Sequence, residues 1–145
     1  MVQKVNIDSA LQLVKEYSIK YRNPGCSKLM ISKKYYLYPS DLIVEEGCLK
    51  WPQKWEFCGE GGVYLILDKF DNVIYIGQTI HFGKRLGSYF RNNNKTCELK
   101  NSWKISPYSI VQIKIPSETI FERLSLEEFL IKNISPNENI RFKYQ

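Results

Sequence analysis

Two apolar runs on either side of a short polar segment constrain the fold of this chain more than any other feature. GVYLIL (62–67) and NVIYIG (72–77) are rich in β-branched and aromatic residues, which favour strands. The segment DKFDN (68–72) between them has the Asp and Asn residues that are typical of turns. The pattern predicts an antiparallel hairpin with a loop of about five residues.

The hairpin also predicts which side chains share a face. Successive residues of a strand point to opposite faces, so we expect Tyr64 beside Ile66, and Tyr75 beside Val73 and Gly77. Glycine at the end of a strand lets another backbone or a phosphate approach closely. We therefore expect the two tyrosines to flank a cleft, with Gly77 as a point of close approach.

These residues resemble the GIY-YIG nuclease family, which is named after two tripeptides about ten residues apart. They stand here as GVY (62–64) and YIG (75–77), with valine in place of isoleucine. Members of the family carry an arginine on the helix that follows, and Arg85 lies eight residues after Gly77. The resemblance covers residues 60–140.

A later segment, EEFLIKNISPNEN (127–139), is similar to the family's glutamate and asparagine pattern, "E..LI....P..N". Aligning the Leu-Ile pair at 130–131 with Pro136 and Asn139 selects Glu127 rather than Glu128. Four motif elements in the family's order are more specific than any single tripeptide.

The resemblance implies a site for phosphodiester hydrolysis with a single Mg²⁺, for which Mn²⁺ can substitute. Tyr64 would take the proton from the attacking water. This role requires neighbouring cations or a metal-bound hydroxide to lower the pKa of the tyrosine from its ordinary value of about 10. Arg85 would hold the scissile phosphate, and Tyr75 would position the water or the phosphate. Glu127 would be the metal ligand. Asn139 would orient the DNA or a group around the metal.

Three further positions bear on this site. Gly77 and Tyr89 are expected to contact the substrate, and Tyr89 stands where several relatives have histidine. Its hydroxyl can hydrogen-bond a phosphate or a water. His81 is the one histidine of the chain, which argues against His-rich metal sites, and we expect it to be a solvated residue at the start of a helix.

Composition is that of a globular protein, with 145 residues of which 43% are hydrophobic. The formal charge of +6 favours a polyanion such as DNA as partner but does not establish one. Four cysteines show no metal-binding spacing. Without a signal sequence or an apolar stretch long enough to span a membrane, we expect a cytoplasmic protein that does not bind membranes.

The rest of the chain predicts an α+β fold: a small three-stranded antiparallel sheet flanked by helices, with an N-terminal helical extension. A helix is expected at 7–21, a third strand at 109–116 and a helix at 117–133. The last helix has Phe121, Leu124, Leu126, Phe129 and Leu130 on its expected apolar face. We divide the chain into an extension (1–59), packed on the core, and a nuclease domain (60–145).

Between the first helix and the hairpin the pattern is weak. We expect residues 22–52 to be irregular, with room for a short helix after Pro39. The cluster KKYYLY (33–38) either stacks on bases or covers the core with its apolar stems. Trp51 and Trp55 are expected to pack the N-terminal segment onto the hairpin, and the segment 91–103 reads equally as a DNA-facing loop or a solvated connection.

Three classes of function follow. The first is a Mg²⁺-dependent DNA endonuclease, whether its role is restriction, repair or the movement of a mobile element. The second is a non-catalytic nucleic-acid-binding module that retains the fold, and the third is a structural interaction protein. The glutamate and the arginine favour the first over the second. The sequence leaves open whether the protein forms a homodimer.

Overall fold

Three antiparallel strands form the centre of the sheet, as the sequence predicts. The computed structural model describes residues 4–37, 49–50, 56–93, 96–99 and 103–139. Strand β4 (Gly62–Leu67) lies between β5 (Val73–Thr79) and β8 (Ser109–Lys114) and is antiparallel to both. The predicted hairpin and third strand are therefore confirmed.

The sheet is wider than predicted. Strands β1 (Met30–Ile31) and β2 (Tyr35–Tyr36) both pair antiparallel with β8, and β3 (Leu49–Lys50) pairs parallel with β2. The expectation of an irregular 22–52 segment is thus wrong at these residues, because a two-residue strand is too short to show a period. The helix considered after Pro39 lies outside the described residues.

Burial also decides how the KKYYLY cluster is used. Tyr35 and Leu37 are completely buried, and Tyr36 is nearly so. The hydroxyl oxygen of Tyr35 accepts a hydrogen bond from the backbone N–H of Glu56, and burial raises the pKa of Tyr35 to about 12. Tyr35 and Tyr36 are therefore core residues, and Tyr38 lies outside the described residues.

A β-bulge in β5 changes the predicted alternation. Ile66 is opposite Tyr75 whereas Leu67 is opposite Val73, so Ile74 is an extra residue without a direct partner. Val73 consequently packs on one face of the sheet, and Ile74 and Tyr75 pack on the other. The expectation that Tyr75 shares a face with Val73 is wrong for this reason.

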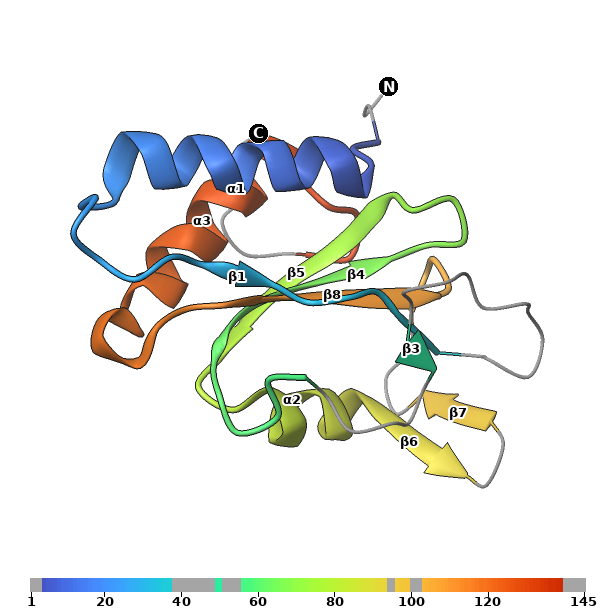
Figure 1. Ribbon diagram of the computed structural model, residues 1–145. Coiled ribbons are helices and arrows are strands. Elements are labelled where there is room, and N and C mark those ends of the chain that lie inside the picture. Colours follow the sequence, from blue (N-terminus) through green and yellow to red (C-terminus); the bar gives the residue numbers. More distant parts are fainter. Residues whose placement is uncertain (1–3, 38–48, 51–55, 94–95, 100–102, 140–145) are drawn as a thin grey trace.

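Helices cover both faces of the sheet. Helices α1 (Ile7–Tyr21) and α3 (Glu122–Ile134) lie on one side, and α2 (Phe82–Tyr89) lies on the other with the hairpin of β6 (Phe90–Asn93) and β7 (Thr96–Leu99) (Figure 1). Asn6 caps α1 by accepting from the N–H of Ser9 at 2.9 Å. The helix predicted at 117–133 is divided into a 3₁₀ turn, η2 (Ser117–Thr119), and α3.

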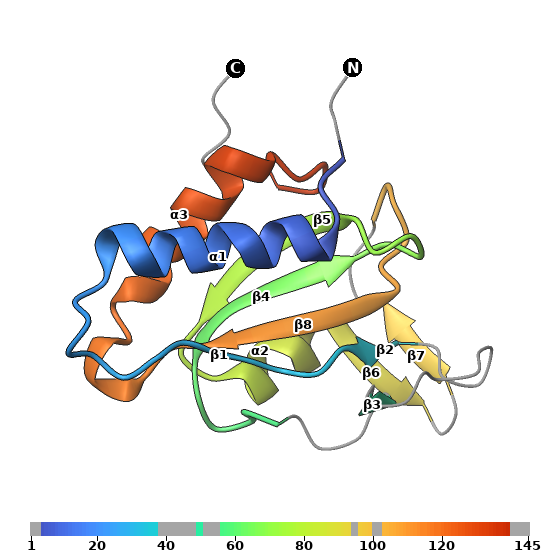
Figure 2. The same ribbon diagram turned by 45° about the horizontal axis from the view of Figure 1, so that its top comes forward.

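The larger core lies between α1, α3 and the sheet, and Figure 2 shows α1 running over the strands beside α3. From α3 it takes Leu126, Leu130, Ile131 and Ile134. Phe121 and Leu124, expected on the same face, are 68% and 52% exposed. Phe121 precedes α3, and Leu124 lies two residues before the buried Leu126, which places it on the opposite side of a helix with 3.6 residues per turn.

The segment before residue 60 shares this architecture. Helix α1 packs in the larger core, while β1 and β2 extend the sheet at β8. The boundary between residues 59 and 60 itself stays a prediction, and Trp51 and Trp55 lie outside the described residues. Over the part of the chain that the structure describes, every helix is too short or too polar to cross a membrane.

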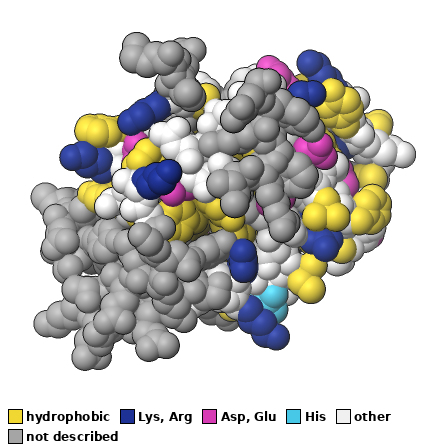
Figure 3. Space-filling model, turned by 180° about the vertical axis from the view of Figure 1, so that it is seen from behind, with side chains coloured by type: hydrophobic (Ala, Val, Ile, Leu, Met, Phe, Trp, Pro, Cys, Tyr) yellow, Lys and Arg dark blue, Asp and Glu magenta, His cyan; other side chains and the backbone are white. Residues whose placement is uncertain are grey.

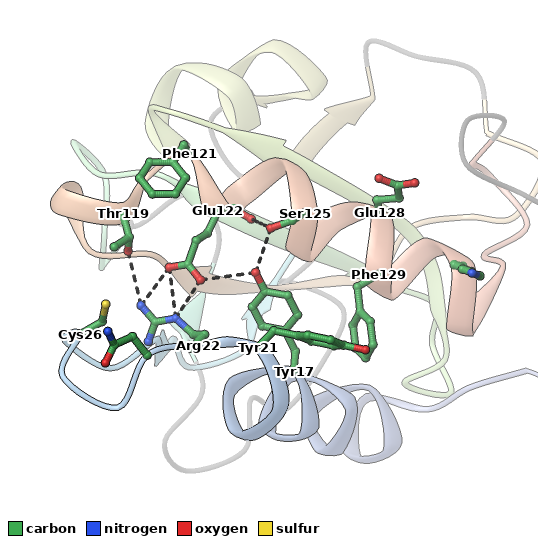
Figure 4. A pocket seen from close by; sticks show the side chains of 12 residues that line it. Tyr17, Tyr21, Arg22, Cys26, Thr119, Phe121, Glu122, Ser125, Glu128 and Phe129 are labelled. Carbon is green, nitrogen blue, oxygen red and sulfur yellow. Dashed lines mark hydrogen bonds and ion pairs between the residues drawn. The ribbon is translucent and has the colours of Figure 1, made fainter.

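A buried ion pair joins the end of α1 to the start of α3. Arg22 donates to both carboxylate oxygens of Glu122, with Nε–Oε1 and Nη2–Oε2 distances of 3.0 Å (Figure 4). The two side chains are only 5% and 14% exposed. Burial by itself would raise the pKa of Glu122, but hydrogen bonds from Arg22, Thr119 and Tyr17, together with the charge of Arg22, outweigh it and hold that pKa below its ordinary value. Tyr17, hydrogen-bonded to Ser125 at 2.8 Å, completes the contact.

Glu122→Gln should lower the free energy of unfolding at neutral pH by about 3 kcal/mol, because it leaves the Arg22 charge buried without its partner. A carboxylate with a lowered pKa stabilises the fold above its unfolded pKa, about 4.3, and loses that contribution as the pH falls through the folded value. The difference from the wild type should therefore narrow toward pH 3 in urea unfolding curves. Glu128→Gln, an exposed change on the same helix, is the control, and an equal loss there would contradict the role of the pair.

Candidate active site

Tyr64 and Gly77 lie directly opposite each other on β4 and β5. The ring of Tyr64 is completely buried and occupies the space beside Gly77. A Cβ atom at position 77 would lie 2.2 Å from both Cζ and Oη of Tyr64, closer than any real contact. The absence of a side chain at Gly77 therefore makes room for the Tyr64 ring, a role that the sequence did not indicate.

Tyr75 is held against Tyr64 from the same face of the sheet. The two rings are stacked with their centroids 6.2 Å apart and an angle of 27° between their planes. Trp103 meets the other side of Tyr75 edge-on, at 5.5 Å and 87°. The pair of tyrosines thus forms one aromatic wall, and Trp103 is a supporting residue that the sequence analysis missed.

Arg85 approaches this wall from α2. Its neighbours Phe82 and Leu86 are completely buried against the sheet, which fixes the helix and leaves Arg85 exposed. The Nε atom of Arg85 donates to the hydroxyl oxygen of Tyr64 at 3.3 Å. A guanidinium beside this hydroxyl stabilises negative charge that develops on the oxygen.

Glu127 and Glu128 leave α3 in different directions. Glu127 is half-buried and lines the same pocket as Tyr64 and Arg85. Glu128 is exposed and lines a different pocket, of about 590 Å³, between α1 and the start of α3 (Figure 4). Glu127, which the motif selected, therefore lies at this cavity and Glu128 does not, while the role of Glu127 as a metal ligand stays a prediction.

One cavity of about 430 Å³ collects most of the predicted residues. Its lining comes from β4, β5, α2, α3 and the segment after α3, and consists of Tyr64, Tyr75, Ile76, Gly77, Gln78, Arg85, Glu127, Ile131, Glu138 and Asn139. Six of the seven predicted site residues are among them. The seventh, Tyr89, has its side chain outside the described part of the structure, so its substrate contact stays a prediction.

Asn139 hydrogen-bonds to the backbone of β5, the edge strand that carries Tyr75 and Gly77. Its Oδ1 accepts from the N–H of Ile76 and its Nδ2 donates to the carbonyl of Ile76, both at 2.8 Å. The N–H of Glu138 also donates to the carbonyl of Ile74 at 2.9 Å. The segment after α3 thereby satisfies the backbone of β5 and holds Tyr75 and Gly77 in place. A contact of Asn139 with DNA stays a prediction.

The residues expected to form the site included neither Gln78 nor Glu138. Gln78 follows Gly77 on β5, and Glu138 accepts from the N–H of Ile105 at 2.8 Å through Oε1. The only signal for either residue is its position next to a motif residue. Neither carries a side chain that is diagnostic without the fold.

Beside the cavity lies a second hollow, also of about 430 Å³, lined by Thr79, Ile80, His81, Lys84 and Arg85. Figure 3 shows lysine or arginine side chains next to the single histidine on this face. His81 is half-buried, and its Nδ1 accepts from the N–H of Lys84 at 3.1 Å, which caps α2. The rim of the site is thus basic, and His81 lies at a helix start as predicted.

The cavity offers one carboxylate, that of Glu127, as a ligand for a divalent cation. Within the described ranges no group of three or more His, Cys, Asp and Glu side chains is close enough to hold a metal. Glu127 supplies a hard oxygen at the cavity wall, and one carboxylate with several waters is a usual way for a protein to hold Mg²⁺. The residues present fit such an ion.

Comparison with known proteins identifies the family to which the chain is similar. A family model described as the GIY-YIG catalytic domain matches residues 60–141, more than half of the chain. UvrABC system protein C from Pseudoalteromonas translucida is 40% identical over 81 residues, 56% of this chain and 13% of that protein. The proteins of the same name from Clostridioides difficile and Methanosphaera stadtmanae are 39% and 38% identical over 82 residues. These matches cover 56% and 57% of this chain and 13% and 14% of those relatives, respectively.

Gly77→Ala should lower the free energy of unfolding by about 2 kcal/mol, because the added methyl group displaces the buried Tyr64 ring. Gly87→Ala is a matched control on α2, where a Cβ would meet nothing within 4 Å. That change should be neutral or stabilising by up to about 1 kcal/mol, since alanine favours a helix. Chemical unfolding of both variants checks this, and an unchanged stability for Gly77→Ala would contradict the packing described.

Proposed function

Because the chain belongs to the GIY-YIG catalytic domain family, we propose that it is a Mg²⁺-dependent DNA endonuclease with Tyr64, Tyr75, Arg85 and Glu127 as its catalytic residues. The family and its UvrABC relatives support a nuclease that acts on DNA, and nucleases of this family generally use a divalent metal ion. One observation carries the assignment to this cavity: a tyrosine hydroxyl, a guanidinium and a carboxylate converge on it from β4, α2 and α3.

Phosphodiester hydrolysis needs a deprotonated water and neutralisation of charge on the phosphoryl group. Tyr64 acts in its phenolate form, which Arg85 stabilises, and becomes the neutral phenol when it accepts the proton of the attacking water. Arg85 also binds the scissile phosphate, and the leaving oxygen takes a proton from solvent. Tyr75 positions the water or the phosphate against the aromatic wall. Mg²⁺, when bound through Glu127, supplies positive charge at the phosphate.

The charge of the protein supports DNA as the substrate. The net charge of +6 and the basic residues beside His81 favour a polyanion, whose binding releases counterions. A non-catalytic module with the same fold would bind DNA without cleaving it, so cleavage separates the two functions. Cytoplasmic location and a homodimer stay predictions.

Replacement of the two neighbouring glutamates tests the metal ligand. Glu127→Ala should abolish Mg²⁺-supported cleavage of plasmid DNA, because it removes the proposed ligand of the metal ion. DNA binding should stay close to that of the wild type, because this carboxylate is proposed to bind the metal and not the DNA. Glu128→Ala is the matched control and should cleave normally, since Glu128 lies outside the cavity. The reverse pair of phenotypes would contradict the proposed orientation of α3.

Tyr64→Phe keeps the buried ring and removes the hydroxyl that contacts Arg85. The single-turnover rate of cleavage should fall by about 10²–10⁴, the usual range for loss of a general base. Thermal stability should change by about 1 kcal/mol or less, since one hydrogen bond is lost. Tyr75→Phe should reduce the rate less, because its role is positioning. Cleavage by Tyr64→Phe at the rate of the wild type would exclude Tyr64 as the base.

A further inference from the structure

Gln78 and Arg123 form a polar contact across the wall of the cavity. Gln78 lies on β5 directly after Gly77 and lines the cavity, and Arg123 lies in the first turn of α3. The Nε of Arg123 donates to Oε1 of Gln78 at 2.8 Å, and its Nη1 donates to the carbonyl of Ile120 at 3.1 Å. Two nitrogens of the planar guanidinium are therefore fixed.

This contact determines which end of the Gln78 amide is available to a ligand. Arginine has no acceptor, so the amide oxygen must face Arg123 and the Nε2 group must face elsewhere. Within the described part of the chain, no carbonyl or carboxylate accepts from Nε2 of Gln78. Gln78 lines the cavity, and the Nε2 group of its amide therefore offers two N–H donors to a ligand there.

The charges of the cavity indicate what these donors are for. Among the residues that the structure describes, the charged ones that line it are Arg85, Glu127 and Glu138, which sum to a formal charge of −1. Such a lining is unfavourable for a DNA backbone, in which every phosphate is negative. Arg123 lies one turn before Glu127 on the same face of α3, and through its bond to Gln78 it fixes a neutral donor group at the cavity wall.

We propose that Gln78 binds a backbone phosphate of the DNA next to the scissile phosphate, and that Arg123 is a positioning residue that orients the Gln78 amide for this contact. The inference rests on the proposed function, because it assigns a second phosphate subsite to the same cavity. Hydrogen bonds from a neutral amide to a charged phosphate are strong enough to affect substrate binding measurably.

The test is single-turnover cleavage of a labelled duplex in Mg²⁺ at increasing enzyme concentration, which separates the half-saturating concentration from the maximal rate. Gln78→Leu should raise the half-saturating concentration about 10-fold with little change in the maximal rate, because the contact exists before and during the reaction. Arg123→Met should raise it less. The double variant should match Gln78→Leu, since Arg123 acts through Gln78.

A second variant separates substrate binding from a merely structural bridge between β5 and α3. Gln78→Glu keeps an oxygen for Arg123 and removes the N–H donors, so the melting temperature should be retained while the half-saturating concentration rises at least as far as in Gln78→Leu. Gln12→Glu, an exposed change on α1, controls for the added negative charge. Normal binding by Gln78→Glu would overturn the proposal.

Two further results would overturn it. If the effects of Gln78→Leu and Arg123→Met are additive, Arg123 does not act through Gln78. If Arg123→Met reduces the salt dependence of binding by the amount of one phosphate contact, a slope change of about 0.9, then Arg123 binds the phosphate directly. Failure of the wild-type protein to cleave DNA would instead contradict the proposed function. If the wild type cleaves and the Gln78 variants have the same half-saturating concentration as the wild type, only this inference is contradicted.

Discussion

The contact between Tyr64 and Gly77 is the constraint on which the site depends. The pairing of β4 with β5 sets the two residues opposite each other, and the tyrosine ring fills the space that a side chain at position 77 would occupy. A ring held on all sides has little rotational freedom, so its hydroxyl stays beside Arg85 without a cost in ordering at the moment of reaction. The bulge at Ile74 then turns Tyr75 to the same face, where it stacks on Tyr64.

The orientation of α3 depends on two adjacent residues of the helix whose side chains hydrogen-bond to different parts of the structure. Glu122 is held by Arg22 after α1, and Arg123 is held by Gln78 on β5. Together they limit rotation of the helix about its axis, which directs Glu127 into the cavity and Glu128 away from it. Arg22, in the segment before residue 60, therefore contributes to the geometry of the site although it does not line the cavity.

The long elements could be predicted from the sequence because their periods are strong. The strand at 62–67 and the helix at 7–21 have the predicted bounds, and six of the residues predicted for the site line one cavity. The bulge at Ile74 could not be predicted, since an extra residue leaves no mark in an apolar run.

Contacts between residues far apart in the chain could not be predicted from the sequence either. The bond between Gln78 and Arg123 joins residues 45 positions apart, and the amide of Asn139 meets β5 across 63 positions. Such pairings follow from the packing of elements and not from the local pattern. The two-residue strands β1 and β2 exist only because β8 offers them a partner, so their residues carry no period of their own.

The most direct measurement of the central claim is conversion of supercoiled plasmid to nicked or linear DNA by the purified wild-type protein, with Mg²⁺ and with Mg²⁺ in excess EDTA. The cavity has a negative formal lining, so neutralisation of the phosphate requires the divalent ion. The account predicts cleavage with Mg²⁺ or Mn²⁺ and none with the chelator. Undiminished cleavage in excess EDTA would contradict it.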